Sequence, residues 1–283
     1  MSKQLDASQT ANRFGVSRTA WRVGVICFFM LMSVFGAALS LVNGSTDISF
    51  EEIMKILAAP GTDPHSMIIW NIRLPRTIVA ALVGINLALS GAILQAILRN
   101  PLADPHLIGI SSGAGVAGVV IMILYPALEY LITPVSFIGA MVAAICIYIL
   151  AWKNGIKPVR IILAGVAVSA FLSAGISGLM IFYSDRVHGA LMWMVGGLAA
   201  RSWPHVSIIL PYAVIGVVLA MASAAYLNIL QLGDEMARGL GVNVEVTRIV
   251  LTAIAALLAA SAVSVVGLLG FVGLVVPHAA RLL

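Results

Sequence analysis

Long uncharged apolar stretches alternate with short polar segments along most of the chain. A helix that crosses a bilayer needs about 20 apolar residues, because the hydrocarbon layer is about 30 Å thick and each helical residue rises about 1.5 Å. Backbone groups inside lipid must also satisfy their own hydrogen bonds, which favours helices over open strands. The predicted spans are Val23–Val42, Thr77–Leu98, Leu107–Tyr125, Val135–Leu150, Ile161–Tyr183, Val206–Leu230 and Ile249–Leu269, followed by the start of a further helix near Phe271.

The composition supports an all-α integral membrane bundle in contact with lipid. Hydrophobic residues make up 61% of the 283 residues and charged residues only 10%, whereas soluble domains are about a quarter charged. The net charge of +5 would raise the question of nucleic acid in a soluble protein. Here the positive residues lie at the ends of apolar runs, where they set membrane topology, so no nucleic-acid partner is expected.

A polar stretch, Met1–Arg22, precedes the first span. The apolar run after it is too long for the core of a cleavable signal peptide. We therefore expect a cytoplasmic N-terminal tail over residues 1–22 and a transmembrane domain over residues 23–283. With this orientation, ten Lys and Arg residues near the span ends lie inside and five lie outside, which agrees with the excess of positive charge on cytoplasmic loops.

The middles of the predicted spans contain no Asp, Glu, Lys or Arg. Intramembrane charges mark proton relays and ion-coupled transport. An ion-coupled secondary transporter is therefore disfavoured, because the spans offer only Ser, Thr, Asn86 and Gln95 as polar groups. A transporter driven by a partner fits the pattern, and so does a subunit that does not transport.

Two arginines flank a proline just before the second span, in Ile72-Arg73-Leu74-Pro75-Arg76. The ring of Pro75 fixes the local backbone. On the predicted outer side this segment forms a rigid, doubly positive knob that suits carboxylates on a partner. Anchoring of interfacial arginines to lipid headgroups explains the same charges equally well.

The connection between the second and third spans is a short polar turn with two prolines, running from Gln95 to Pro105. A segment rich in Gly and Ser, residues 109–115, opens the next span. A glycine-rich helix start can bind phosphate, but the chain has no Gly-x-x-x-x-Gly-Lys-Ser/Thr and no strand precedes the turn.

The segment between the sixth and seventh spans is predicted to form a short amphipathic helix on the inner side. Leu232, Met236 and Leu240 recur every four residues, and charged residues occupy the other faces. Such a helix is well shaped to fit a groove on a cytoplasmic partner. A solvated connector lying on the headgroups is the alternative.

Glycines and Pro277 interrupt the last apolar stretch. Broken helices in transporters often line the substrate route, although a proline kink can serve packing alone. The histidines do not show the spacing of a metal site, so no resident metal is expected. The residues assigned to the translocation path or a helix break are Gln95, Asn100, Pro101, Ser111, Gly113, Gly270, Gly273 and Pro277.

These four segments, taken in order, resemble the FecCD-type permeases of ATP-binding-cassette importers for ferric siderophores, haem and cobalamin. The resemblance runs from about Ile69 to Leu283. It implies a homodimer in the bacterial cytoplasmic (inner) membrane, with about ten spans per subunit and a path at the dimer interface. It also implies a periplasmic or lipid-anchored binding protein and a separate ATPase that binds the ATP, with no cofactor on this chain.

The resemblance assigns roles to two of the segments. Arg73 and Arg76 are similar to the family's outer arginines that meet glutamates on the binding protein. The segment similar to the family's ATPase-coupling helix contains Leu232, Gly233, Asp234, Glu235, Ala237, Arg238, Leu240 and Gly241. The family continues for two further spans beyond Leu283, so this chain, with about eight spans, is expected to be truncated at its C-terminus, which keeps a non-transporting remnant in consideration.

Overall fold

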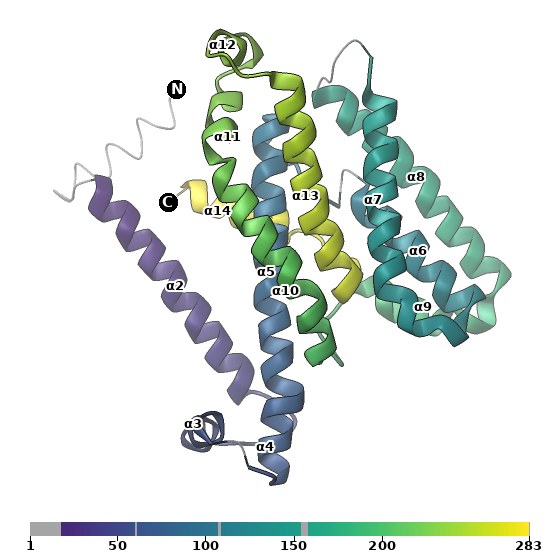
Figure 1. Ribbon diagram of the computed structural model, residues 1–283. Coiled ribbons are helices and arrows are strands. Elements are labelled where there is room, and N and C mark those ends of the chain that lie inside the picture. The colour runs from purple at the N-terminus through teal and green to yellow at the C-terminus, as the bar shows by residue number, and fades with distance from the viewer. Residues whose placement is uncertain (1–17, 60, 107–108, 154–157, 283) are drawn as a thin grey trace. The chain divides into compact units, whose positions relative to one another are not determined.

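The computed structural model describes residues 18–59, 61–106, 109–153 and 158–282. Six helices in this part of the chain are long and apolar enough to cross a membrane, and Ile110–Leu124 and Val272–Leu282 are shorter apolar helices. The chain divides into two compact units, Met1–Thr77 with Ala279–Leu283, and Ile78–His278. Figure 1 shows the helices of each unit.

The first unit contains the apolar helix α2 (Arg18–Val42) and three short helical segments. These are α3 (Phe50–Ala58), α4 (Pro64–Ile68) and the π-helical turn η1 (Ile69–Arg73), which leads into α5 (Leu74–Leu98). Ser49 begins α3, because its side chain accepts a hydrogen bond from the backbone N–H of Glu52. The small core of this unit consists of the buried residues Ile53 and Ile56 of α3, Ile69 of η1 and Ile48 of the loop before α3.

The second unit is built on α5 and α13 (Val244–Val266), and α13 is the more buried of its spans. Two polar side chains of α5 reach α13 inside the apolar core. Asn86 Nδ2 donates to Ser261 Oγ at 2.9 Å, and Ser90 Oγ donates to the carbonyl of Ala255 at 2.7 Å. All four residues are buried, so these bonds join the two helices where no water can replace them.

The helices between residues 110 and 195 form a group on one side of α13 (Figure 1). Helix α7 (Ile132–Ala151) and helix α10 (Trp203–Ala222) both contact α13, and α6 (Ile110–Leu124) packs on α7 and α8 (Pro158–Phe182). The backbones of α6 and α7 touch at Gly113 and Gly139, where a Cβ on either would lie within 2.5 Å of the other's carbonyl oxygen. The shorter elements are η2 (Pro126–Leu131), η3 (Ser184–Arg186), α9 (Val187–Val195), α11 (Ala224–Gln231), α12 (Asp234–Gly239) and α14 (Val272–Leu282).

The predicted all-α membrane architecture is confirmed, with differences at several ends. The first span begins at Arg18 rather than Val23, and residues 1–17 of the predicted tail lie outside the described residues. The predicted span Val206–Leu230 is two helices, α10 and α11, which meet at Ser223. An apolar run cannot reveal an interruption of one residue, because neither helix changes its composition there.

Candidate functional site

The two arginines of the Arg-Leu-Pro-Arg segment have different surroundings. Arg73 is only 2% exposed, and its guanidinium donates to the carbonyls of Leu41 at 2.6 Å, Val42 at 2.7 Å and Thr46. These carbonyls end α2 and begin the following turn, so a cation there satisfies them and favours the negative end of the helix dipole. The prediction that Arg73 is part of an exposed knob is therefore wrong, whereas Arg76 is half-buried and its side chain forms no hydrogen bond or ion pair within the described residues.

The backbone around Arg73 is shaped for this buried position. The π turn that ends at Arg73 is wider than an α turn, because the N–H of Leu74 bonds to the carbonyl of Ile69 five residues back. The guanidinium also needs a glycine beside it, since a Cβ on Gly44 would lie 2.5 Å from Arg73 Nη2. A larger residue at position 44 would therefore displace the arginine from the carbonyls.

Helices α5 and α14 cross at very close range, and this crossing brings together two residues assigned to the translocation path. A Cβ on Gly91 would lie 1.8 Å from the carbonyl oxygen of Gly273. The side chain of Gln95, one turn further along α5, is buried and donates to the carbonyls of Gly273 at 3.4 Å and Leu274 at 3.2 Å. The amide therefore fixes the first turn of α14 against α5.

The other residues assigned to the path do not gather at this crossing. Asn100 and Pro101 lie in the turn after α5, where Asn100 Oδ1 accepts from the backbone N–H of Leu102 at 3.0 Å. Ser111 and Gly113 are buried in α6, and Gly113 serves the contact with α7.

The predicted helix break is present at Gly270, which lies between α13 and α14, but not at Gly273 or Pro277, which lie inside α14. Pro277 is buried inside α14 and does not interrupt it, and Gly270 lies near the ring of His106. The break runs from Gly267 to Phe271, with φ values of +80° and +67° at those two residues. Sequence reasoning missed Gly267, where a Cβ would lie 2.1 Å from the carbonyl oxygen of Trp193.

Asp104 is a buried carboxylate in the two-proline turn and is 4% exposed. Its Oδ1 accepts from the backbone N–H of His106 at 2.7 Å, and its Oδ2 lies beside Gly273 at the start of α14. Burial raises the pKa of Asp104 above its usual value, and the backbone N–H of His106, the charge of His106 and the backbone N–H of Leu274 offset this only in part.

The raised pKa of Asp104 predicts a pH-dependent stability difference. The charged form is disfavoured in the folded protein, so stability is lost as the pH rises from the ordinary value of 3.8 through the higher folded pKa. We expect Asp104→Asn to melt at the same temperature as the wild type near pH 4 and at a higher temperature near pH 7. Parallel melting curves across this range would contradict the assignment, and Asp185→Asn, at an exposed aspartate, is the matched control.

Helix α12 and the residues next to it expose an apolar stripe that faces away from the other helices of the second unit. Leu232, Met236 and Leu240 are each about 60% exposed, whereas Ala237 is fully buried. The predicted amphipathic pattern is therefore present, although the helix itself covers only Asp234–Gly239. Gly233 and Gly241 flank it with φ values of +115° and +80°, which only glycine adopts without strain.

At the first residue of α12, the carboxylate of Asp234 binds two arginines. Arg248 of α13 donates from Nη1 to Asp234 Oδ2 at 3.0 Å and from Nη2 to Asp234 Oδ1 at 2.7 Å, and it is 1% exposed. Arg99, directly after α5, bonds to the same Oδ1. Sequence reasoning did not predict this cluster, because its members lie 135 and 14 residues from Asp234 and only the fold brings them together.

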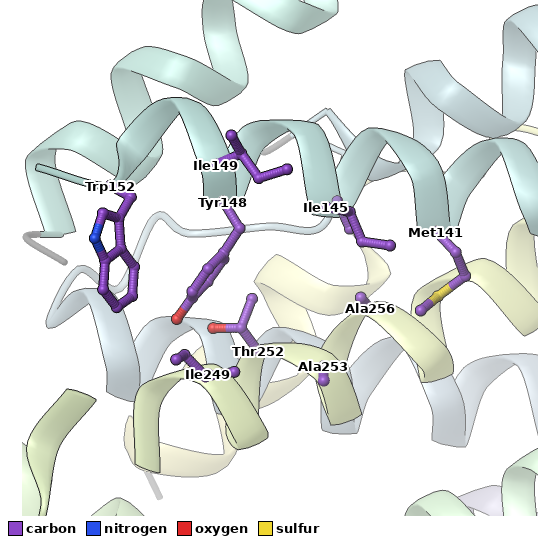
Figure 2. A pocket seen from close by; sticks show the side chains of 10 residues that line it. Met141, Ile145, Tyr148, Ile149, Trp152, Ile249, Thr252, Ala253 and Ala256 are labelled. Carbon is purple, nitrogen blue, oxygen red and sulfur yellow. The ribbon is translucent and has the colours of Figure 1, made fainter. Parts of the chain in front are cut away.

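An apolar groove of about 440 Å³ lies between α7 and α13. Figure 2 shows the hydroxyl of Tyr148 pointing toward Thr252, with Met141, Ile145 and Trp152 along the wall. None of the lining residues is charged, so the groove offers no group to neutralise a charged ligand. Among the residues that the structure describes, no group of three or more His, Cys, Asp or Glu residues is placed to hold a metal ion.

The long apolar helices, the break between α13 and α14 and the exposed apolar residues around α12 define a multi-pass membrane protein. The chain belongs to the FecCD transport family, whose family model matches residues 31–283. The resemblance seen in the four segments is thereby confirmed. As a member of this family, the chain is a transporter subunit rather than an enzyme, and ATP hydrolysis belongs to a separate subunit in such systems.

Named relatives and a solved structure agree with this assignment. The Fe(3+)-citrate import system permease protein YfmD of Bacillus subtilis is 36% identical over 266 residues, which are 94% of this chain and 80% of that protein. The cobalamin import system permease protein BtuC of Halobacterium salinarum is 42% identical over 218 residues, 77% of this chain and 59% of that protein. An inward-facing structure of a metal-chelate type ABC transporter matches with a TM-score of 0.79 and 28% identity, covering 92% of this chain and 81% of that one.

Proposed function

We propose that this protein carries a ferric siderophore, or a related metal chelate such as haem or cobalamin, across the bacterial cytoplasmic membrane. The family match over residues 31–283 carries the proposal. Ferric chelates come first because a relative covered over 80% of its length is named as a permease for Fe(3+)-citrate import, and cobalamin follows from a second relative. The chain binds no cofactor of its own in this proposal, and ATP binds to the partner subunit.

The outer surface of α12 is the proposed contact with the ATPase. Met236 of α12 and the flanking residues Leu232 and Leu240 are exposed and form an apolar stripe that a groove on the partner would cover. The stripe supports this role because exposed apolar surface at a helical end is unfavourable in water and favours a protein contact. A cytoplasmic N-terminus is also part of the proposal, and the distribution of Lys and Arg favours it.

A second copy of the chain is the proposed partner within the membrane. Helix α8 supports this, because only 17% of its apolar window is buried within the chain, compared with 78% for α13. Its exposed residues include Val166 and Phe171, together with the small residues Ser173 and Ser177, which lie one turn apart on the same face.

We also propose that the translocation path runs beside the break between α13 and α14. The hydrogen bonds of Gln95 hold α14 against α5 and so fix the position of this break.

Reconstitution tests the function directly. Vesicles containing the permease, its ATPase and its binding protein should accumulate ferric citrate, ferric hydroxamate, haem or cobalamin only with ATP. An ATPase variant that cannot hydrolyse ATP is the control. Uptake driven by an imposed ion gradient without ATP would favour a secondary transporter instead, and ATPase assembly without uptake of any chelate would favour a non-transporting subunit.

Arg76 is the proposed docking residue for the binding protein, since Arg73 is committed to α2. We expect Arg76→Glu to weaken the affinity for the binding protein about tenfold at low ionic strength, because reversal replaces attraction by repulsion. The loss should shrink at high salt, where exposed charges are screened. Arg76→Lys should keep most of the affinity, and equal affinities of Arg76→Glu and the wild type at moderate salt would exclude the assignment.

A further inference from the structure

The carboxylate of Asp234 is the meeting point of three helical elements. It lies at the first position of α12, it pairs with Arg248 in the first turns of α13, and it also bonds to Arg99 directly after α5. We propose that Asp234 is the positioning residue through which movement of α12 is passed to α5 and α13. The inference rests on the proposed ATPase contact of α12.

The geometry of the pair with α13 favours transmission of a displacement. Both oxygens of Asp234 bind Arg248, so the contact fixes direction as well as distance. Arg248 is 1% exposed, whereas the side chain of Asp234 is 32% exposed, so water reaches the carboxylate but does not readily solvate the guanidinium if α12 moves away. A buried charge that loses a two-point hydrogen-bonded partner is unfavourable even where other groups lie near it, so α13 follows α12 more readily than the pair separates.

The pair with Arg99 extends the contact to a second spanning helix. Arg99 has a φ of +49°, a value that residues other than glycine adopt rarely, and it stands between α5 and the two-proline turn. The side chain of Arg99 is 38% exposed and that of Arg248 only 2%, so the pair of Asp234 with Arg99 is the weaker of the two. Displacement of Asp234 therefore acts on α13 first and on the end of α5 second.

A second ion pair between α12 and α13 is exposed to water and therefore serves as a comparison for the pair of Asp234 with Arg248. Arg238 of α12 and Glu245 of α13 approach to 3.9 Å, with side chains 59% and 46% exposed. This pair joins the same two helices, but water and salt can replace either partner. Glu245→Gln is therefore the control, because it removes an α12–α13 ion pair and the charge that Glu245 presents to Arg248 while leaving the Asp234–Arg248 hydrogen bonds in place.

The test measures the number of chelate molecules taken up per ATP hydrolysed in vesicles that contain the assembled transporter. We expect Asp234→Asn to lower this ratio about fivefold or more. ATPase retention and ATP hydrolysis should persist, because the exposed stripe of α12 is unchanged. Asp234→Glu should restore most of the ratio, and Glu245→Gln should leave it unchanged.

If Asp234 served only the stability of the fold, Asp234→Asn would lower the melting temperature and the ATPase retention together. The transporters that still assembled would then take up the same number of chelate molecules per ATP as the wild type. An unchanged ratio in Asp234→Asn overturns the inference. If Asp234→Asn does not assemble, Arg99→Gln decides, since it leaves the buried pair intact and should still lower the ratio about twofold. A wild-type transporter that takes up no chelate at all would refute the proposed function rather than this inference.

Discussion

Alanine at Gly91 should lower the melting temperature of the detergent-solubilised protein by about 5 °C or more. The added Cβ would lie 1.8 Å from the carbonyl oxygen of Gly273, far inside any permitted contact. The obstacle is backbone, so no side-chain rotation can relieve it and α5 must move away from α14. Overpacking of this kind costs about 1–3 kcal/mol, and the separation would also break the hydrogen bonds of Gln95.

Gly84→Ala is the matched control for this substitution. Gly84 lies on the same helix two turns earlier, and a Cβ there would meet no atom within 4 Å. Its melting temperature should equal or slightly exceed that of the wild type, because alanine favours a helix more than glycine does. Equal melting temperatures for the Gly91 and Gly84 variants would mean that α5 and α14 do not cross as described.

Replacement of Arg73 by methionine should destabilise the first unit by about 3 kcal/mol or more. Methionine fills similar space but donates nothing, so the carbonyls of Leu41, Val42 and Thr46 lose a charged donor. Hydrogen bonds to charged groups contribute about 1.5–3 kcal/mol each. Amide hydrogen exchange over residues 41–49 should become faster, since this turn would open locally.

Arg76→Met separates stability from docking. Arg76 makes no side-chain hydrogen bond or ion pair in the described part of the chain, so its loss should leave melting temperature and exchange rates unchanged while weakening attachment of the binding protein. A lower melting temperature with unchanged docking in Arg76→Met would mean that Arg76 serves stability rather than docking. A normal melting temperature with weaker docking in Arg73→Met would make Arg73 a docking residue after all.

The spans could be predicted from the sequence because lipid imposes a length and a composition on each helix. The residues at which two helices touch could not be predicted in this way. Gly84, Ala88 and Ala92 recur every four residues in the sequence and predict a packing face on α5, yet the backbone contact occurs at Gly91. A stripe shows only that a neighbour can approach, whereas the crossing angle decides which small residue it meets.

The charged residues show the same limit. Arg73 and Arg76 look equivalent in the sequence, and their different roles depend on a π turn and on the end of a helix about 30 residues earlier. Asp234 lies in the segment whose amphipathic pattern the sequence predicts, but the fold brings its partners Arg99 and Arg248 to it from 135 and 14 residues away. Local patterns therefore indicate candidate segments, and tertiary contacts determine which residues in them are buried, paired or exposed.

The hydrogen bonds that join α5 to α13 bear on the order of synthesis. Asn86 and Ser90 pair with residues 175 and 165 positions further along the chain. At about 5–20 residues per second, the ribosome makes that partner helix on the order of ten seconds or more after α5 has left it. An unpaired amide in hydrocarbon is costly throughout that interval, so nascent α5 should remain beside the insertion machinery or another polar surface until α13 arrives.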